Sequence, residues 1–179
     1  INPQRRLKLL DYETIAANPK VFCGYSDITA LHTVFNRLCG FITFHAPMPN
    51  TDYTTMDEFS LHSLKDAVFG NPSKRVLLPP PGTSMTSLCG GSACGKLVGG
   101  NLSLLTATLG SPYEIDTRDS ILFIEETEEE LYKVDRALTA LALAGKFKHC
   151  NAILLGTFSD CTAADPAPSL TLPQIFREI

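Results

Sequence analysis

Two short apolar segments flanking one amphipathic helix constrain the fold of this chain more than any other feature. Residues 21–24 and 41–44 are rich in strand-forming side chains, and residues 27–38 between them repeat apolar side chains at helical spacing. Two strands joined through a helix pair in parallel, because the helix carries the chain back to its starting end. The pattern predicts an α/β fold, with Gly40 ending the helix.

The rest of the chain continues this alternation. Further helices are predicted for residues 5–18, 54–69, 102–109, 128–144 and 172–179, and further strands for residues 120–124 and 152–156. Asn101 is the expected N-cap of the helix at 102–109. The glycine-rich stretch 89–101 has few apolar anchors, and no element is predicted there.

A proline cluster indicates where the chain divides into domains. Pro79-Pro80-Pro81-Gly82 is typical of a stiff linker. We therefore expect a partial N-terminal α/β domain at residues 1–75, a linker at 76–82 and a partial C-terminal domain at 83–179.

Charge and cysteine content exclude several classes of function. The 179 residues carry a net charge of −4 without a basic stripe, so nucleic acid is not an expected partner. No apolar run is long enough to cross a bilayer, and no membrane association is expected. The six cysteines include Cys89 and Cys94, but no second Cys or His pair matches them, so we predict neither a metal site nor disulfides. A reducing compartment is the simpler expectation.

The turn between the first strand and its helix suggests nucleophilic catalysis. Gly24-Tyr25-Ser26-Asp27 has the layout of a nucleophile elbow, in which a sharp strand-to-helix turn exposes one hydroxyl. Ser26 would be the nucleophile, and the backbone N–H of Asp27 would be an oxyanion donor. The alternative is that Ser26 and Asp27 only cap the helix.

A serine nucleophile needs a base and an acid that orients the base. Glu125 directly follows the strand at 120–124, at the edge of an α/β sheet where catalytic groups gather. A solvated acidic turn is the alternative. Of the four histidines, His45 is the best placed, just past the strand at 41–44, although a role in lining a pocket is favoured over that of a base.

The ordered motifs along the chain resemble the LD-carboxypeptidases, a family of serine peptidases that includes the microcin C self-immunity hydrolases. The matching segments are Leu10-Asp11-Tyr12-Glu13, Gly24-Tyr25-Ser26-Asp27-Ile28-Thr29-Ala30-Leu31, Thr43-Phe44-His45, Gly99-Gly100-Asn101-Leu102-Ser103, Leu122-Phe123-Ile124-Glu125-Glu126, Val134-Asp135-Arg136 and Leu155-Gly156.

This resemblance implies a Rossmann-like N-terminal domain and a C-terminal domain with a β-barrel-like core, with the active site between them. It also implies a Ser–Glu–His triad that uses Ser26 and Glu125 without a metal or cofactor. We further expect His45 and Asn101 to line the substrate pocket. The implied reaction releases terminal D-alanine from murein tetrapeptides during cell-wall recycling. Family members are typically cytoplasmic homodimers.

The family's histidine, in a Gly-x-Pro-x-Gly-His stretch, would follow residue 179, and its glycine-rich oxyanion turn would precede residue 1. We therefore expect the chain as it stands to be inactive. Three alternatives remain: a microcin C-type hydrolase of peptidyl-nucleotide amides, a non-catalytic muropeptide-binding protein, and a packing domain in which Ser26 is a helix cap.

Overall fold

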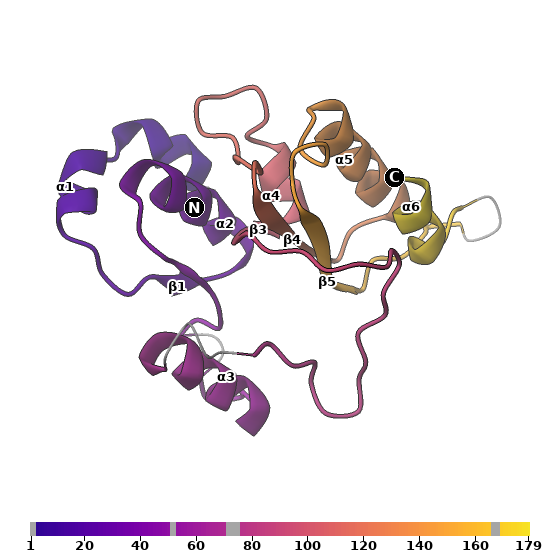
Figure 1. The fold of residues 1–179 in the computed structure, drawn as a ribbon, viewed down its shortest axis with the longest axis horizontal. Helices are drawn as coiled ribbons and strands as arrows, with labels where there is room; N and C mark the ends of the chain where they lie inside the picture. The colour runs from indigo at the N-terminus through magenta and orange to yellow at the C-terminus, as the bar shows by residue number, and fades with distance from the viewer. Residues whose placement is uncertain (1–2, 51–52, 71–75, 166–168) are drawn as a thin grey trace.

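The computed structural model describes residues 3–50, 53–70, 76–165 and 169–179. Two α/β units lie side by side, and each contains its own parallel sheet (Figure 1). The expected domain end at residue 75 lies outside the described residues. Residues 76–82 contain neither helix nor strand. The domain division therefore stays a prediction.

The N-terminal unit contains the strand–helix–strand arrangement that the sequence predicts. Strand β1 (Cys23–Gly24) pairs in parallel with β2 (Phe44–His45), with Gly24 opposite His45. Three helical pieces connect the strands: η2 (Ser26–Ile28), α2 (Thr29–Val34) and η3 (Phe35–Cys39), of 3₁₀, α and π type. Gly40 ends the last piece at φ 73°, the left-handed conformation expected of a C-cap glycine.

The helix predicted for residues 5–18 is divided into two pieces. A 3₁₀ helix, η1 (Pro3–Leu9), precedes α1 (Tyr12–Ala17). Asp11 separates them because its extended backbone and its side chain, which accepts from Thr14 N at 3.0 Å, form an N-cap. Helix α3 (Glu58–Phe69) begins later than predicted because Asp57 caps it in the same way. The core of this unit contains Leu7, Ala30, Val34 and Phe35.

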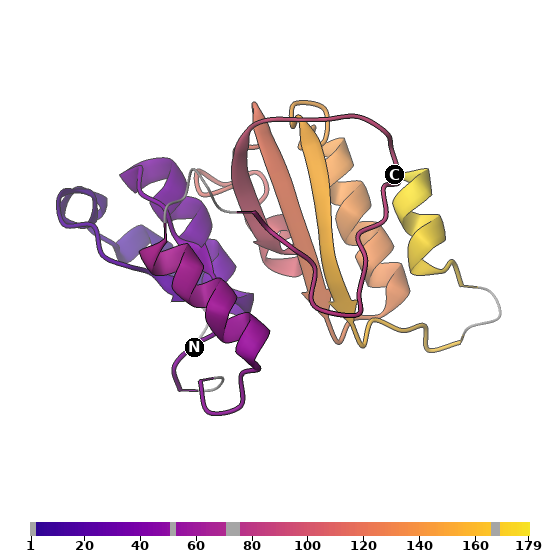
Figure 2. The ribbon, with the colours of Figure 1, turned by 60° about the horizontal axis from the view of Figure 1, so that its bottom comes forward.

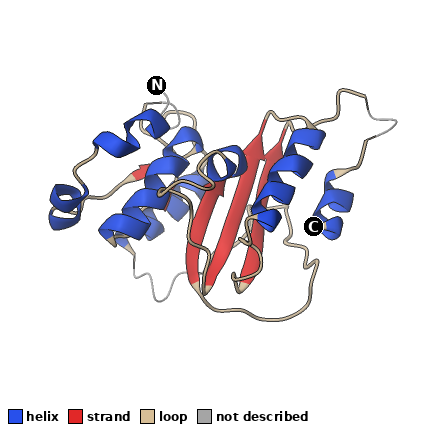
Figure 3. Cartoon of the chain, turned by 90° about the horizontal axis from the view of Figure 1, so that it is seen from above, coloured by secondary structure: helices blue, strands red, loops and turns tan. Residues whose placement is uncertain are grey.

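The C-terminal unit is a parallel sheet in the order β3-β4-β5, and its three long strands lie side by side (Figure 3). The strands are β3 (Lys96–Asn101), β4 (Ser120–Thr127) and β5 (Ala152–Ser159). The helices are α4 (Leu102–Thr106), α5 (Leu131–Leu143) and α6 (Leu172–Glu178).

Side chains from all three helices pack on one face of this sheet. The buried core is Leu102, Leu105, Ile115, Leu122, Ile124, Val134, Leu138, Leu141, Cys161 and Ile175. The structure confirms the α/β class. The described strands of this unit form an open parallel sheet rather than a closed barrel.

Strand β3, which follows the long loop of residues 76–95, is the element that sequence patterning misses (Figure 2). Its glycines lower strand propensity, but both are required by close backbone approach. A Cβ added at Gly99 would lie 1.8 Å from the carbonyl oxygen of Phe123, and one at Gly100 would lie 2.5 Å from Thr29 Oγ1. Both residues also have φ values, 135° and 143°, that other residues rarely adopt.

Candidate active site

Ser26 lies at a sharp turn directly after β1. Its φ of 56° is one of few positive values among non-glycine residues, and such strain is characteristic of a nucleophile elbow. Ser26 is the first residue of η2, and the N-cap positions of η2 and α2 are held by Tyr25 and Ile28. Among the described residues, no hydrogen bond supports the interpretation of Ser26 as a helix cap. Asp27 follows as an exposed residue of η2.

Two hydrogen bonds hold the strand end before the elbow. The carbonyl oxygen of Gly24 accepts from Ala46 N at 3.0 Å and contacts His32 Nε2 at 2.8 Å. Because a carbonyl only accepts, Nε2 must carry the proton. A Cβ on Gly24 would lie 2.8 Å from the Ile28 side chain, so this position needs glycine for η2 to turn back closely.

His32 is a functional candidate that sequence reasoning did not select. The residue is 6% exposed, and its Nδ1 has no hydrogen-bond partner among the described residues. Burial lowers the pKa of His32, and its bond to Gly24 only partly offsets that effect, so the ring stays neutral near pH 7. Because His32 lies on the apolar face of a predicted helix, the sequence did not indicate that its ring contacts the Gly24 carbonyl before the elbow.

Glu125 lies within β4 rather than after it, and its side chain is 17% exposed. Its Oε1 lies 3.8 Å from Nε2 of His45, the last residue of β2. Burial, with a further contribution from the charge of Glu126, raises the pKa of Glu125. The structure thus brings together two of the predicted site residues, from different sheets.

His45 faces Glu125 as a neutral ring. The residue is exposed overall, but its side chain is only 28% exposed, and desolvation of the ring, followed by the proximity of His32, lowers the pKa of His45 to about 4. Its ring packs edge-on against Phe123, with centroids 5.3 Å apart. At 3.8 Å the two side chains are in contact but beyond hydrogen-bond distance.

Glu126 points to the opposite face of β4 and has a structural role that the sequence analysis missed. The residue is 4% exposed, and its carboxylate accepts from Asn101 Nδ2 (2.6 Å), Ser103 N (2.9 Å), Ser103 Oγ (2.6 Å) and Thr127 N (3.0 Å). The alternation of side chains along a strand could have predicted this burial. Glu126 lies on the same buried face as Leu122 and Ile124, whereas Glu125 lies on the other face.

Asn101 is placed differently from the sequence expectation of a pocket-lining residue. The residue is 3% exposed. Its Oδ1 caps α4 by accepting from Leu104 N at 3.2 Å, which confirms the predicted N-cap, and its Nδ2 donates to Glu126. These bonds occupy its amide within the protein, and a substrate contact by Asn101 stays a prediction.

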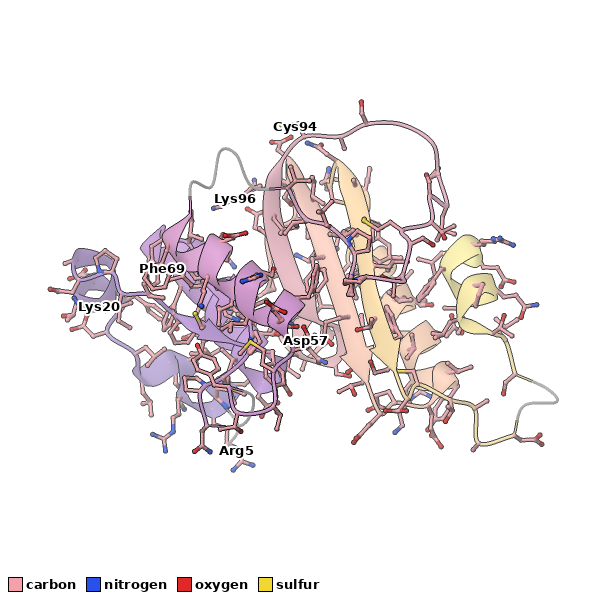
Figure 4. The ribbon with its side chains drawn as sticks, turned by 90° about the horizontal axis from the view of Figure 1, so that it is seen from below. Arg5, Lys20, Asp57, Phe69, Cys94 and Lys96 are labelled. Carbon is pink, nitrogen blue, oxygen red and sulfur yellow. The ribbon has the colours of Figure 1, made fainter. Side chains whose placement is uncertain are left out.

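Two cavities adjoin His45. One of about 410 Å³ is lined by Tyr25, His45, Ala46, Pro47, Thr55, Met56, Asp57 and Ser60. Figure 4 labels Asp57, at the end of α3 that borders this cavity. A second of about 310 Å³ includes His32, His45 and Phe123 and extends to Lys96 at the start of β3. His45 is therefore placed to contact a ligand in either space.

The described residues offer no cluster of three or more His, Cys, Asp or Glu side chains for a metal ion. Cys89 and Cys94 are both exposed and free. Within the same residues, no helix combines the length and apolar character needed to span a membrane.

Comparison with known proteins identifies relatives of both units. The LD-carboxypeptidase N-terminal domain family matches residues 2–46, and the LD-carboxypeptidase C-terminal domain family matches residues 94–179. The chain is 42% identical over 171 residues to the "Probable murein peptide carboxypeptidase" of Bacillus subtilis strain 168, which covers 94% of this chain and 53% of that protein.

Two further comparisons point the same way. The microcin C7 self-immunity protein MccF of Escherichia coli is 30% identical, over 97% of this chain and 59% of its own length. The crystal structure of a muramoyltetrapeptide carboxypeptidase from Oxalobacter formigenes superposes with a TM-score of 0.80 at 28% identity, over 97% of this chain and 58% of that chain. The chain thus spans little more than half the length of these relatives.

Proposed function

This chain belongs to the LD-carboxypeptidase family, and we propose that it carries the nucleophile and the acid of a serine carboxypeptidase that releases terminal D-alanine from murein tetrapeptides. The observation that carries this proposal is the strained turn at Ser26, next to the strand whose last residue, His45, contacts the partly buried Glu125. Catalytic groups of α/β proteins gather at such carboxyl ends of parallel strands.

In the proposed mechanism, Ser26 Oγ attacks the carbonyl carbon of the bond between the L-centre and D-alanine. A histidine expected after residue 179 takes the serine proton and gives it to the leaving amine. The N–H of Asp27 supports the negative oxygen of the tetrahedral intermediate. Departure of D-alanine leaves an acyl group on Ser26, which water removes by the reverse sequence of proton transfers.

Glu125 has the properties of the acid that orients the histidine. It is largely buried, and a carboxylate in a site of low polarity stabilises a neighbouring imidazolium strongly. His45 and Asn101 are proposed to line the substrate pocket. His45 is better supported because it borders both cavities, whereas the amide of Asn101 is engaged within the protein. We further propose that the protein acts in the cytoplasm as a homodimer, as family members typically do.

The test uses the full-length protein, a murein tetrapeptide and a coupled assay for free D-alanine. Ser26→Ala should lower kcat by about 10⁴-fold or more, as loss of a serine nucleophile does. Ser84→Ala, in the exposed loop before β3, is the matched control and should leave kcat unchanged. Release of D-alanine that survives Ser26→Ala would remove Ser26 from the mechanism.

The similarity to MccF supports a second candidate, hydrolysis of a peptidyl-nucleotide amide. The same variants should be assayed with an aminoacyl sulfamoyl nucleoside. Faster turnover of that substrate than of the tetrapeptide would favour the second candidate. Tight tetrapeptide binding without release of D-alanine would favour a muropeptide-binding protein.

A further inference from the structure

Ser26 and Glu125 come from different sheets, so their relative position depends on how the two units dock. Figure 1 shows α2 lying against β3 at the junction of the units. Thr29, the first residue of α2, is completely buried there. Its Oγ1 accepts a hydrogen bond from the backbone N–H of Asn101 at 3.0 Å.

This bond joins the immediate surroundings of the two proposed catalytic residues. Thr29 directly follows η2, the 3₁₀ turn that begins with Ser26. Asn101 pairs with Glu125 in the register of β3 with β4. One hydrogen bond between the units therefore links the turn that bears Ser26 to the strand pair that bears Glu125.

The local geometry is adapted to this contact. β3 is an edge strand of its sheet, and its Asn101 N–H turns toward α2 for a partner. A buried backbone N–H without a partner is strongly unfavourable, which gives the contact a strong preference for a side-chain acceptor at Thr29. Gly100 makes the approach possible, since a Cβ there would lie 2.5 Å from Thr29 Oγ1.

We infer that Thr29 is a positioning residue for the hydrolysis proposed above: its hydroxyl sets the separation between Ser26 and Glu125 by docking α2 on β3. This inference rests on the proposed function for its catalytic consequence. The docking contact itself can be measured without activity.

The experiment compares three variants of the full-length protein. Thr29→Val keeps the shape of the side chain but removes the acceptor, whereas Thr29→Ser keeps the acceptor. Thr33→Val is the matched control, because Thr33 is also buried, lies one helical turn further along α2, and its hydroxyl donates within that helix to the carbonyl oxygen of Thr29. For each variant we would measure kcat, KM, stability by urea unfolding, and the hydrogen-exchange rate of the backbone amide of Asn101.

We expect Thr29→Val to lower kcat by about 10-fold to 100-fold with KM changed by less than about 3-fold, the scale of a small misplacement of catalytic groups. Thr29→Ser should restore kcat to within about 3-fold of wild type, and Thr33→Val should leave kcat near wild type even if it lowers stability. A merely structural role predicts instead that kcat follows stability in both valine variants, and that result would overturn the inference.

Hydrogen exchange separates the inference from the proposed function. The backbone amide of Asn101 should exchange slowly in wild type, Thr29→Ser and Thr33→Val, and at least about 10-fold faster in Thr29→Val. Equal protection in all four proteins would reject the docking contact whatever the activity. A wild type that releases no D-alanine would reject the proposed function, and with it the catalytic role of Thr29, while the exchange data would still report on the contact.

Discussion

His45 Nε2 lies 3.8 Å from Glu125 Oε1, so the end of the two-stranded sheet meets the central strand of the three-stranded sheet. Burial favours the uncharged form of both side chains, since it lowers the pKa of His45 to about 4 and raises the pKa of Glu125. The pair is therefore a contact between a neutral imidazole and a carboxylate whose charge is costly. Both groups should make folding stability depend on pH, with opposite signs.

We predict that Glu125→Gln stabilises the fold at neutral pH. Because the pKa of Glu125 is raised on folding, the folded protein binds the proton more tightly, and stability falls as pH rises from the ordinary glutamate pKa through the raised value. Glutamine should therefore increase the free energy of unfolding by about 0.5–2 kcal/mol at pH 7, but little at pH 4. Urea unfolding at both pH values measures this, with the exposed Glu178→Gln as control. An equal gain at pH 4 would contradict the stated cause.

We predict the opposite dependence at His45. Its pKa falls on folding from about 6.5 to about 4, so its contribution to stability is present above pH 6.5 and is lost as pH falls toward 4. His45→Gln should make the free energy of unfolding fall by about 1–2 kcal/mol less between pH 7 and pH 4 than in wild type. This value allows for partial exposure of the ring. Thermal unfolding from pH 7 to pH 4 tests this, and His62→Gln on the exposed side of α3 should leave the wild-type slope.

We predict that Ser26→Gly is more stable than Ser26→Ala. Ser26 has a φ of 56°, where a Cβ costs about 1–2 kcal/mol and glycine does not pay that penalty. Because glycine also loses more backbone entropy on folding, the net difference should be about 1 kcal/mol in urea unfolding. At Asp27, within the 3₁₀ turn, the glycine variant should be the less stable of the pair. If the glycine variant were less stable than the alanine variant at Ser26 as well as at Asp27, that result would argue against strain at the elbow.

We predict that His32 supports the elbow through its bond to Gly24. His32→Leu should cost about 0.5–1.5 kcal/mol, because the carbonyl of Gly24 loses its side-chain donor but keeps the bond from Ala46 N, and His32→Gln should recover much of this by placing an amide N–H near the position of Nε2. Denaturant unfolding measures both, with His62→Leu as the surface control. Nitrogen-15 NMR should show the neutral tautomer protonated at Nε2, and protonation at Nδ1 instead would exclude the bond.

Local patterning predicted much of the fold correctly. The parallel pairing of β1 with β2, the cap at Gly40 and the N-cap at Asn101 all depend on residues close in sequence. Helical spacing also identified α5, whose inner face is buried as expected, although the helix begins at Leu131 rather than at residue 128. These features follow from propensity and periodicity, which act over a few residues.

The errors have a common physical origin in contacts between distant segments. β3 was missed because Gly99 and Gly100 lower local strand propensity, while their purpose is close approach to Phe123 and Thr29. The sequence analysis considered Glu125 and Glu126 only as neighbours, whereas opposite faces of β4 give them different environments. The contact between His32 and Gly24 likewise depends on how helix and strand pack.

The amino-acid sequence by itself determined the α/β class and the strand-to-helix turn at Ser26, because short-range spacing encodes both, and its ordered motifs identified the family by resemblance. Only the tertiary structure decided that the turn is strained, that Glu125 meets His45, that Glu126 is buried in hydrogen bonds, and that Thr29 joins the two units at Asn101. The reason is that burial and hydrogen-bond partners are properties of the packed chain, and each of these contacts joins segments that the sequence keeps apart.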